Sequence, residues 1–287
     1  MDRAVASELA QRCHKVLEPL HSFVYFAPEV EKAFVDAGLE AGRMAYFAGR
    51  AAPLGPVGAG VVSATFYNFN PRLVARCIPR AWELVEPDEV LKLRFAGAET
   101  ALRRLLGDAA DAPELAELAE LVRRAAEATT PEGRPLFAAH ADLPWPDNPV
   151  GVLWHGVSLL REYRGDGHIA ALVTEGLSGL EAIVTHTATG KGFRAEVAKS
   201  MRGWSDEEWE NAERELRERG LLDADGALTP EGEALRTRLE ERTDELASAP
   251  YRRIGEDGAS RIAELAKPFT RRVLKGGGIP RELFGRG

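Results

Sequence analysis

The sequence predicts a mainly helical protein: a helical N-terminal domain, then a smaller domain of three helices, a short β-hairpin wing and a closing helix. Two observations predict this fold class. Apolar residues recur at intervals of three and four in the first predicted helix, over 3–17, and helix signals continue along much of the chain. After residue 220, LLDADGALT sets a tight turn between two short apolar stretches, which is typical of a hairpin.

The elements of the N-terminal half follow from start and stop signals. Pro28 opens a helix that Gly38 closes, and the loop 51–60 contains two prolines and three glycines. The stretch 61–69, VVSATFYNF, is the best strand candidate, although its periodicity leaves a buried helix open. Further helices are expected over the following ranges: 3–17, ended by Pro19, then 71–84, 87–106 and 113–128.

The run 143–149, LPWPDNP, is the clearest boundary because its three prolines forbid regular structure. It divides the chain of 287 residues into a helical domain over 1–145, a winged-helix-like domain over 146–250 and a basic tail over 251–287.

The second half begins with an apolar helix over 150–163, a turn RGDG and a helix from His168 to Glu175. Two more helices are expected over 180–187 and 193–202. Ser205 and Glu208 then form a capping box that opens a helix ending at Gly220. Thr229 caps the last helix, which Pro230 begins.

Composition excludes several classes of protein. With 45% apolar and 29% charged residues, the chain is typical of a soluble globular protein. It has no apolar run of membrane-spanning length and no hydrophobic signal core near its start, so we expect a cytoplasmic protein. Cys13 and Cys77 are too few for a disulfide framework or a thiolate zinc site, and we expect them to be reduced and buried.

The charge of the whole chain is −8, which disfavours a protein whose main task is to coat nucleic acid. From Tyr251 onwards, however, nine Lys and Arg residues face four acidic ones, a local charge of +5. This tail could meet an acidic partner or the acidic domain of its own chain.

The run 216–236, LRERGLLDADGALTPEGEALR, resembles the signature of the MarR-type winged helix. With YFAGRAAPLG (46–55), FYNFNP (66–71) and LWH…LLREYRGDGH, nearly the whole chain resembles a SalK-like winged-helix family. The resemblance implies a fold more directly than an activity. If this domain bound DNA as MarR-type regulators do, its helix at 205–219 would enter the major groove.

The charge of that helix opposes DNA reading. It carries seven acidic residues and three arginines, a net charge of −4, and DNA phosphates would repel its acidic leading end. We therefore expect the winged helix to serve chiefly as a scaffold, with DNA a disfavoured partner. A ligand-responsive regulator of the MarR type is the alternative, and a homodimer is left open.

A polar cluster in residues 154–168 offers the candidate functional residues. As acid–base catalysts we consider His155 and His168, with Glu162 or Asp166 to orient the imidazole. The turn RGDG could bring His168 towards Glu162, and Asp166 could instead cap the next helix. As metal or haem ligands, His155, His168 and His186 could converge, but their spacing matches no metal signature, so we assign no metal site and leave the cofactor open.

The third interpretation is a small-molecule pocket between the domains, in which arginines hold an anionic group and aromatic rings form walls. Its expected ligand-binding residues are Arg50, Tyr46, Phe66, His155, Arg161, Glu162, Arg164 and His168. Among the other histidines, His21 before the aromatic FVYF is the one expected to reach a pocket. The structural alternative is a salt-bridge network at a domain junction with satisfied core histidines.

Overall fold

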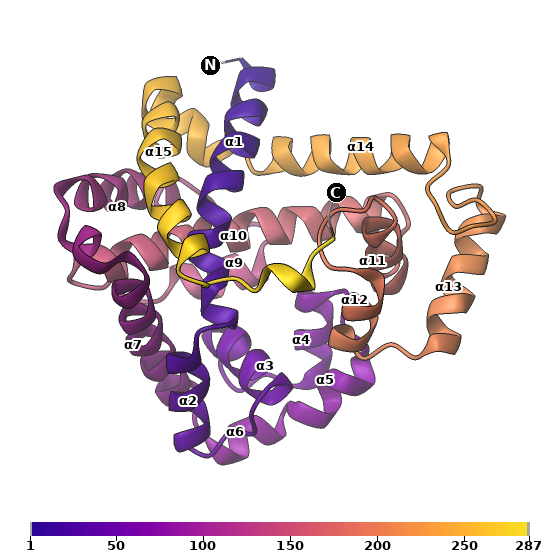
Figure 1. Ribbon diagram of the computed structural model, residues 1–287, viewed down its shortest axis with the longest axis horizontal. Coiled ribbons are helices and arrows are strands. Elements are labelled where there is room, and N and C mark those ends of the chain that lie inside the picture. Colours follow the sequence, from indigo (N-terminus) through magenta and orange to yellow (C-terminus); the bar gives the residue numbers. More distant parts are fainter. Residues whose placement is uncertain (1, 286–287) are drawn as a thin grey trace.

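The computed structural model describes residues 2–285, and its regular structure is helical (Figure 1). The helices of the first half are α1 (Arg3–Ser22), α2 (Pro28–Asp36), α3 (Arg43–Ala51), α4 (Ala59–Phe66), α5 (Pro71–Cys77), α6 (Arg80–Leu84), α7 (Pro87–Leu106), α8 (Pro113–Ala126) and α9 (Pro135–Ala141). Those of the second half are α10 (Pro149–Thr174), α11 (Gly179–Thr187), α12 (Ala195–Arg202), α13 (Asp206–Glu218), α14 (Pro230–Leu246) and α15 (Ala249–Lys275).

The predicted mainly helical class is confirmed, but the predicted β-hairpin wing is wrong. Within residues 2–285 there is no β-strand, and the expected wing contains a single bridge between Leu222 and Leu228. Helix α13 ends just before Gly220, and Thr229 caps α14. The residues between them reverse the chain in a turn, in which the Asp223 carboxylate accepts the N–H groups of Asp225 and Ala227. Backbone hydrogen bonds cross this turn from Asp223 N–H to Ala227 and from Thr229 N–H to Leu221, but they enclose one isolated bridge and form no ladder.

The strand predicted over 61–69 is also wrong, because residues 59–66 form α4. Val62 and Phe66, four residues apart, are both buried on one face of this helix. A helix satisfies its own backbone hydrogen bonds, whereas a lone strand in this helical layer would have no neighbour to pair with.

The turn predicted at RGDG is wrong as well, since α10 runs through it without interruption. Gly167 explains why a glycine suits the middle of this helix. A Cβ placed there would lie 2.9 Å from Nη1 of Arg134 and 3.2 Å from Cβ of Leu246. The glycine therefore lets two distant segments approach the helix closely, which no local pattern reveals. Pro19 likewise lies inside α1 and does not end it.

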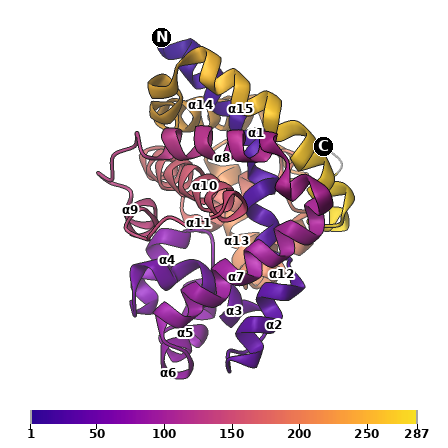
Figure 2. The same cartoon turned by 90° about the vertical axis from the view of Figure 1, so that its left-hand side faces the viewer.

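Two hydrophobic cores share this long helix, one along residues 150–163 and the other at residues 171–172. The first draws on residues 9–163 and 247–273, and the second on residues 171–239. Helix α10 contributes to both cores. Helix α15 lies along α1 and α8, as Figure 2 shows, so most of the basic C-terminal residues sit on a packed helix, while Arg286 lies outside the described residues.

Candidate functional site

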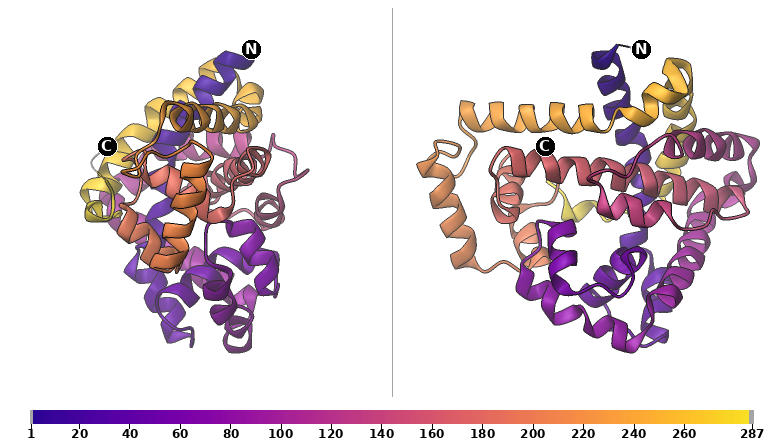
Figure 3. Two further views of the ribbon diagram at one scale, coloured as in Figure 1. Left: turned by 90° about the vertical axis from the view of Figure 1, so that its right-hand side faces the viewer. Right: turned by 180° about the vertical axis from the view of Figure 1, so that it is seen from behind.

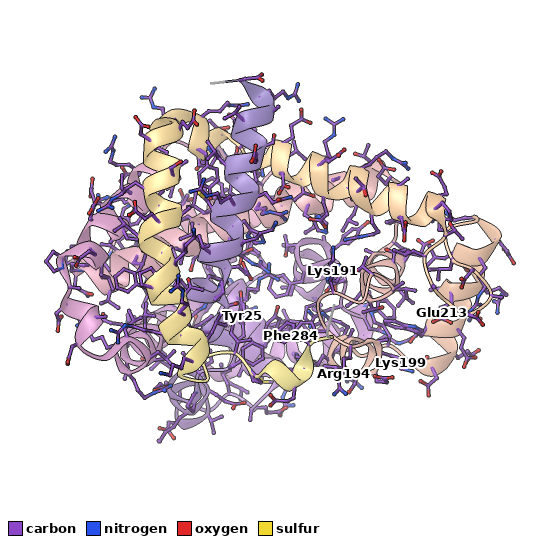
Figure 4. All side chains as sticks on the ribbon, turned by 45° about the horizontal axis from the view of Figure 1, so that its top comes forward. Tyr25, Lys191, Arg194, Lys199, Glu213 and Phe284 are labelled. Carbon is purple, nitrogen blue, oxygen red and sulfur yellow. The ribbon has the colours of Figure 1, made fainter. Side chains whose placement is uncertain are left out.

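A cavity of about 490 Å³ opens between the two halves of the molecule. One side is formed by the end of α1, the 3₁₀ helix η1 (Phe23–Tyr25), α2 and α3, and the other by α12 and the segment after α15. Tyr25 and Phe284, labelled in Figure 4, come from opposite ends of the chain and border this same cavity. Its arginines are Arg43, Arg50, Arg94, Arg161 and Arg202. Its apolar walls include Phe26, Val30, Phe34, Phe193, Met201 and Phe284.

Two of these arginines share one buried carboxylate. Glu162 on α10 is fully buried and accepts from Nε of Arg50 at 3.2 Å and from Nη2 of Arg50 at 2.9 Å. Arg161 Nη1 donates to the same carboxylate at 2.8 Å. Burial raises the pKa of Glu162, but Arg161 and Arg50 outweigh it and hold that pKa well below its usual value. The Arg50 guanidinium also lies 4.4 Å from the centre of the Phe66 ring.

Two other arginines have no carboxylate partner among the described residues. Arg94 is 3% exposed, its Nη1 lies 3.3 Å from Nε2 of His140, and its Nη2 has no hydrogen-bond partner. Arg202 donates from Nε to the side-chain oxygen of Asn68 at 3.0 Å and lies 4.3 Å from the centre of the Phe69 ring. Burial lowers the pKa of Arg94, and it lowers that of Arg202 to about 10. Within the described part of the chain, neither guanidinium forms an ion pair with a carboxylate.

Two tyrosines border the same cavity with ring centres 5.2 Å apart. Tyr25 is hydrogen-bonded through its hydroxyl to Nε2 of His21 at 2.8 Å. Burial raises the pKa of Tyr46, but the guanidiniums of Arg50, Arg202 and Arg161 outweigh it and hold that pKa below its usual value. A phenol among guanidiniums is well suited to contact an anionic or polar ligand.

The structure brings some of the predicted site residues together. Arg50, Tyr46 and Arg161 line the cavity, Glu162 holds two of its arginines, and Phe66 lies beneath Arg50. Arg164 does not line this cavity, and donates instead to Glu240 at 3.2 Å and Asp244 at 2.9 Å on α14.

His155 and His168 do not line this cavity. Their separation of 13 residues on one continuous helix corresponds to about 20 Å. His155 is packed against Trp145 and Phe95, at 4.7 and 5.4 Å between ring centres, and both of its ring nitrogens lack hydrogen-bond partners. His168 shares a hydrogen bond of 2.8 Å with Thr243.

Asp166 does not cap a following helix, since it lies within α10; its carboxylate instead accepts the backbone N–H of Phe137, in the first turn of α9, at 2.9 Å. His21 does not line the cavity itself, but its ring is hydrogen-bonded to the hydroxyl of Tyr25, which does. Sequence reasoning missed Tyr25, Arg94 and Arg202. The aromatic run FVYF after His21 was the only sequence signal for Tyr25. Arg94 and Arg202 lie in helices whose sequences carry no sign of a binding site.

Two further searches concern the part of the chain that the structure covers. Between residues 2 and 285, no group of three His, Cys, Asp or Glu side chains is arranged to hold a metal ion. Over the same stretch, no helix is both long enough and apolar enough to cross a membrane.

Comparison with known families decides the broader relationship. The profile of a helix-turn-helix family matches residues 10–280. The chain belongs to this helix-turn-helix family. The match confirms the helix-turn-helix assignment made from the sequence, without addressing the SalK-like or MarR-type likeness. Neither the curated proteins nor the solved structures that were compared with the chain contain a match.

Helix α12, a turn at Gly203 and helix α13 follow one another in the order helix, turn, helix. Gly203 adopts φ 74°, a left-handed conformation that glycine reaches without strain, and its N–H closes the end of α12. The capping box of Ser205 and Glu208 then starts α13, as predicted. Trp209 and Leu216 are buried and anchor α13 in the second core.

The leading end of α13 contacts the N-terminal half of the chain. The Glu208 carboxylate accepts from the side-chain amide of Asn70 at 3.2 Å and forms an ion pair with Arg72 of α5. Figure 3 shows α13 at one end of the molecule, connected to the rest by α12 and by the long α14. The exposed side chains of α13 include Glu207, Glu210, Glu215 and Glu218.

Proposed function

We propose that the protein binds a small organic anion with an apolar or aromatic body in the cavity between α1–α3 and α12. The observation that carries this proposal is the pair Arg94 and Arg202, two guanidiniums that face the cavity without a carboxylate partner among the described residues.

A buried charge is costly unless it is paired, and the cost is several kcal/mol for an isolated ion in a protein interior. The Arg50–Glu162–Arg161 group has two guanidiniums and one carboxylate, so it adds positive charge to the same region. Glu18 and Glu31 also line the cavity, but burial raises the pKa of Glu18, which favours its neutral form, and Glu31 accepts the backbone N–H of Gly42 at 3.0 Å. An anionic ligand would supply the missing counter-charge. Arginine suits this role because its planar guanidinium can bind a carboxylate or phosphate through two parallel hydrogen bonds.

The walls and the size of the cavity favour an organic anion over an inorganic one. Phe26, Phe34, Phe193, Met201 and Phe284 offer an apolar lining that a sulfate or phosphate would leave unused. A volume of about 490 Å³ falls within the usual range of ligand pockets, roughly 300–1,000 Å³.

Titration calorimetry with naphthoate, an aromatic carboxylate, tests this proposal. Arg202→Gln should weaken binding about tenfold or more, since a hydrogen bond to a charged group contributes roughly 1.5–3 kcal/mol. The matched control is Arg214→Gln, which removes the same charge from the exposed face of α13. Equal affinities in both variants, or no binding to the unaltered protein, would contradict the proposal.

One observation favours a second function, that of a ligand-responsive DNA-binding regulator of the MarR type. Met201 and Arg202 of α12, the helix before the turn at Gly203, line the cavity, so a bound ligand would contact that helix directly. Lys191, Arg194 and Lys199, labelled in Figure 4, supply basic side chains around α12. Against it stand the acidic face of α13 and the ion pair between Lys199 and Asp206.

Selection from a random duplex library at about 0.1 M salt separates the two functions. We expect no enriched sequence, because the acidic α13 would be repelled by phosphates. Enrichment of a palindromic site that binds with nanomolar affinity would favour the regulator.

A further inference from the structure

A chain of three hydrogen bonds leads from the cavity into the core. The Tyr25 hydroxyl lies 2.8 Å from Nε2 of His21, and Nδ1 of the same ring lies 2.8 Å from the hydroxyl of Ser158. That hydroxyl in turn lies 2.7 Å from the backbone carbonyl of Trp154 on α10. Each distance is that of a well-formed hydrogen bond.

The chemistry of the last acceptor fixes the direction of every proton. A carbonyl oxygen can only accept, so Ser158 donates its one proton to Trp154. Ser158 must then accept from Nδ1–H of His21. A neutral imidazole carries a single N–H, and Nε2 is therefore the acceptor of the Tyr25 proton.

Burial keeps both side chains in the neutral forms that this order requires. His21 is fully buried, and its pKa is held well below the usual value by burial and by nearby Arg161. Burial raises the pKa of Tyr25 to about 12. At neutral pH the imidazole therefore keeps a free lone pair and the phenol keeps its proton.

We infer that the Tyr25 oxygen offers only acceptor lone pairs to the cavity, and that Tyr25 selects ligands carrying a hydrogen-bond donor, a hydroxyl or amine, in addition to their anionic group. This inference rests on the proposed function and narrows its ligand class to hydroxy- or amino-substituted organic anions. Tyr25 can only accept a hydrogen bond from the ligand, since it donates its own proton to His21.

The proton order can be tested without any ligand. In protein labelled with ¹⁵N histidine, the couplings of each ring nitrogen to the ring carbon-bound protons identify which nitrogen carries the proton. His21 signals are assigned by their loss in His21→Gln. We expect a protonated Nδ1 and a bare Nε2 at neutral pH, and a protonated Nε2 would overturn the inference.

Selectivity is tested with naphthoate, a panel of hydroxynaphthoate isomers and their methoxy ethers, which accept but cannot donate. At least one hydroxy isomer should bind roughly three- to tenfold more tightly than naphthoate, which corresponds to one neutral hydrogen bond, and its methoxy ether should show no such gain. The preference should disappear in Tyr25→Phe and persist in Tyr163→Phe, the same change outside the cavity.

The outcomes separate this inference from the proposed function. If all the naphthoates bind equally and Arg202→Gln weakens them all, the anion site stands and the role of Tyr25 is wrong. A hydroxy preference that survives in Tyr25→Phe also overturns the role of Tyr25 and leaves the anion site standing. Failure of every naphthoate to bind overturns the anion site and the selectivity together.

Discussion

His155 should make the protein sensitive to acid, and replacing it with leucine should remove that part of the sensitivity. The side chain is 1% exposed, both ring nitrogens lack partners, and burial, with His140 and Arg94 nearby, lowers its pKa to about 3. An unfolded chain binds a proton at this residue below about pH 6.5, whereas the folded protein does not until about pH 3.

The sign of the effect follows from that difference. The contribution of His155 to stability is fully present above about pH 6.5, and it is lost progressively as the pH falls towards the folded pKa. At about pH 4 the loss covers roughly 2.5 pH units, which corresponds to about 3 kcal/mol. Buried His140, whose pKa is lowered to about 4, adds a loss in the same direction.

Urea unfolding of the natural protein and of His155→Leu at about pH 7 and about pH 4 measures this contribution. Near pH 7 the variant should be at least as stable, because leucine fits an apolar site without leaving polar atoms unpaired. Near pH 4 it should keep about 3 kcal/mol that the natural protein loses. Leu153→Met, a buried change on the same helix, should shift both measurements equally. An unchanged difference between the two proteins at the two pH values would refute the reasoning.

Two further changes probe the buried ion group and the second core. Glu162→Gln leaves the guanidiniums of Arg50 and Arg161 uncompensated and should lower the free energy of unfolding in urea by about 3–5 kcal/mol. Glu127→Gln, which breaks the exposed pair with Arg123, should lower it by at most about 1 kcal/mol. Equal losses in the two variants would mean that the buried group is hydrated. Leu216→Ala, at a fully buried position of α13, should cost about 2–5 kcal/mol, and a loss under about 0.5 kcal/mol would contradict its place in the core.

The sequence predicted those parts of the fold that depend on neighbouring residues. The capping box of Ser205 and Glu208 is a contact over three residues, and Thr229 with Pro230 marks the start of α14 in the same local way. The RGDG turn failed because the role of Gly167 depends on Arg134 and Leu246, which come from distant parts of the chain. The hairpin failed because the turn signal predicts a reversal of the chain, which is present, and does not predict how far the pairing beside it extends, which is a single bridge.

The candidate site shows the same division. Arg50, Tyr46 and Arg161 could be chosen from the sequence because they stand in segments dense with aromatic or charged side chains. Arg94 and Arg202 resemble the many exposed arginines of ordinary helices, and only packing reveals that they border the cavity without a carboxylate partner among the described residues. The expected meeting of His155 and His168 required a turn that α10 does not make.

Helix α10 is one continuous helix shared by both halves of the molecule. Residues 150–163 are built into the first core and residues 171–172 into the second, with no break between them. A hinge between the halves would have to bend or unwind a helix of 26 residues, so large rigid-body rotation is strongly resisted. The short α12 contacts the cavity through Met201 and Arg202, and its end is hydrogen-bonded to the N-terminal half, from Asn70 N–H to the Arg202 carbonyl at 2.9 Å and from Arg202 Nε to the Asn68 side chain at 3.0 Å. Whatever occupies the cavity therefore meets the two residues that directly precede the turn at Gly203, from which the chain continues into α13.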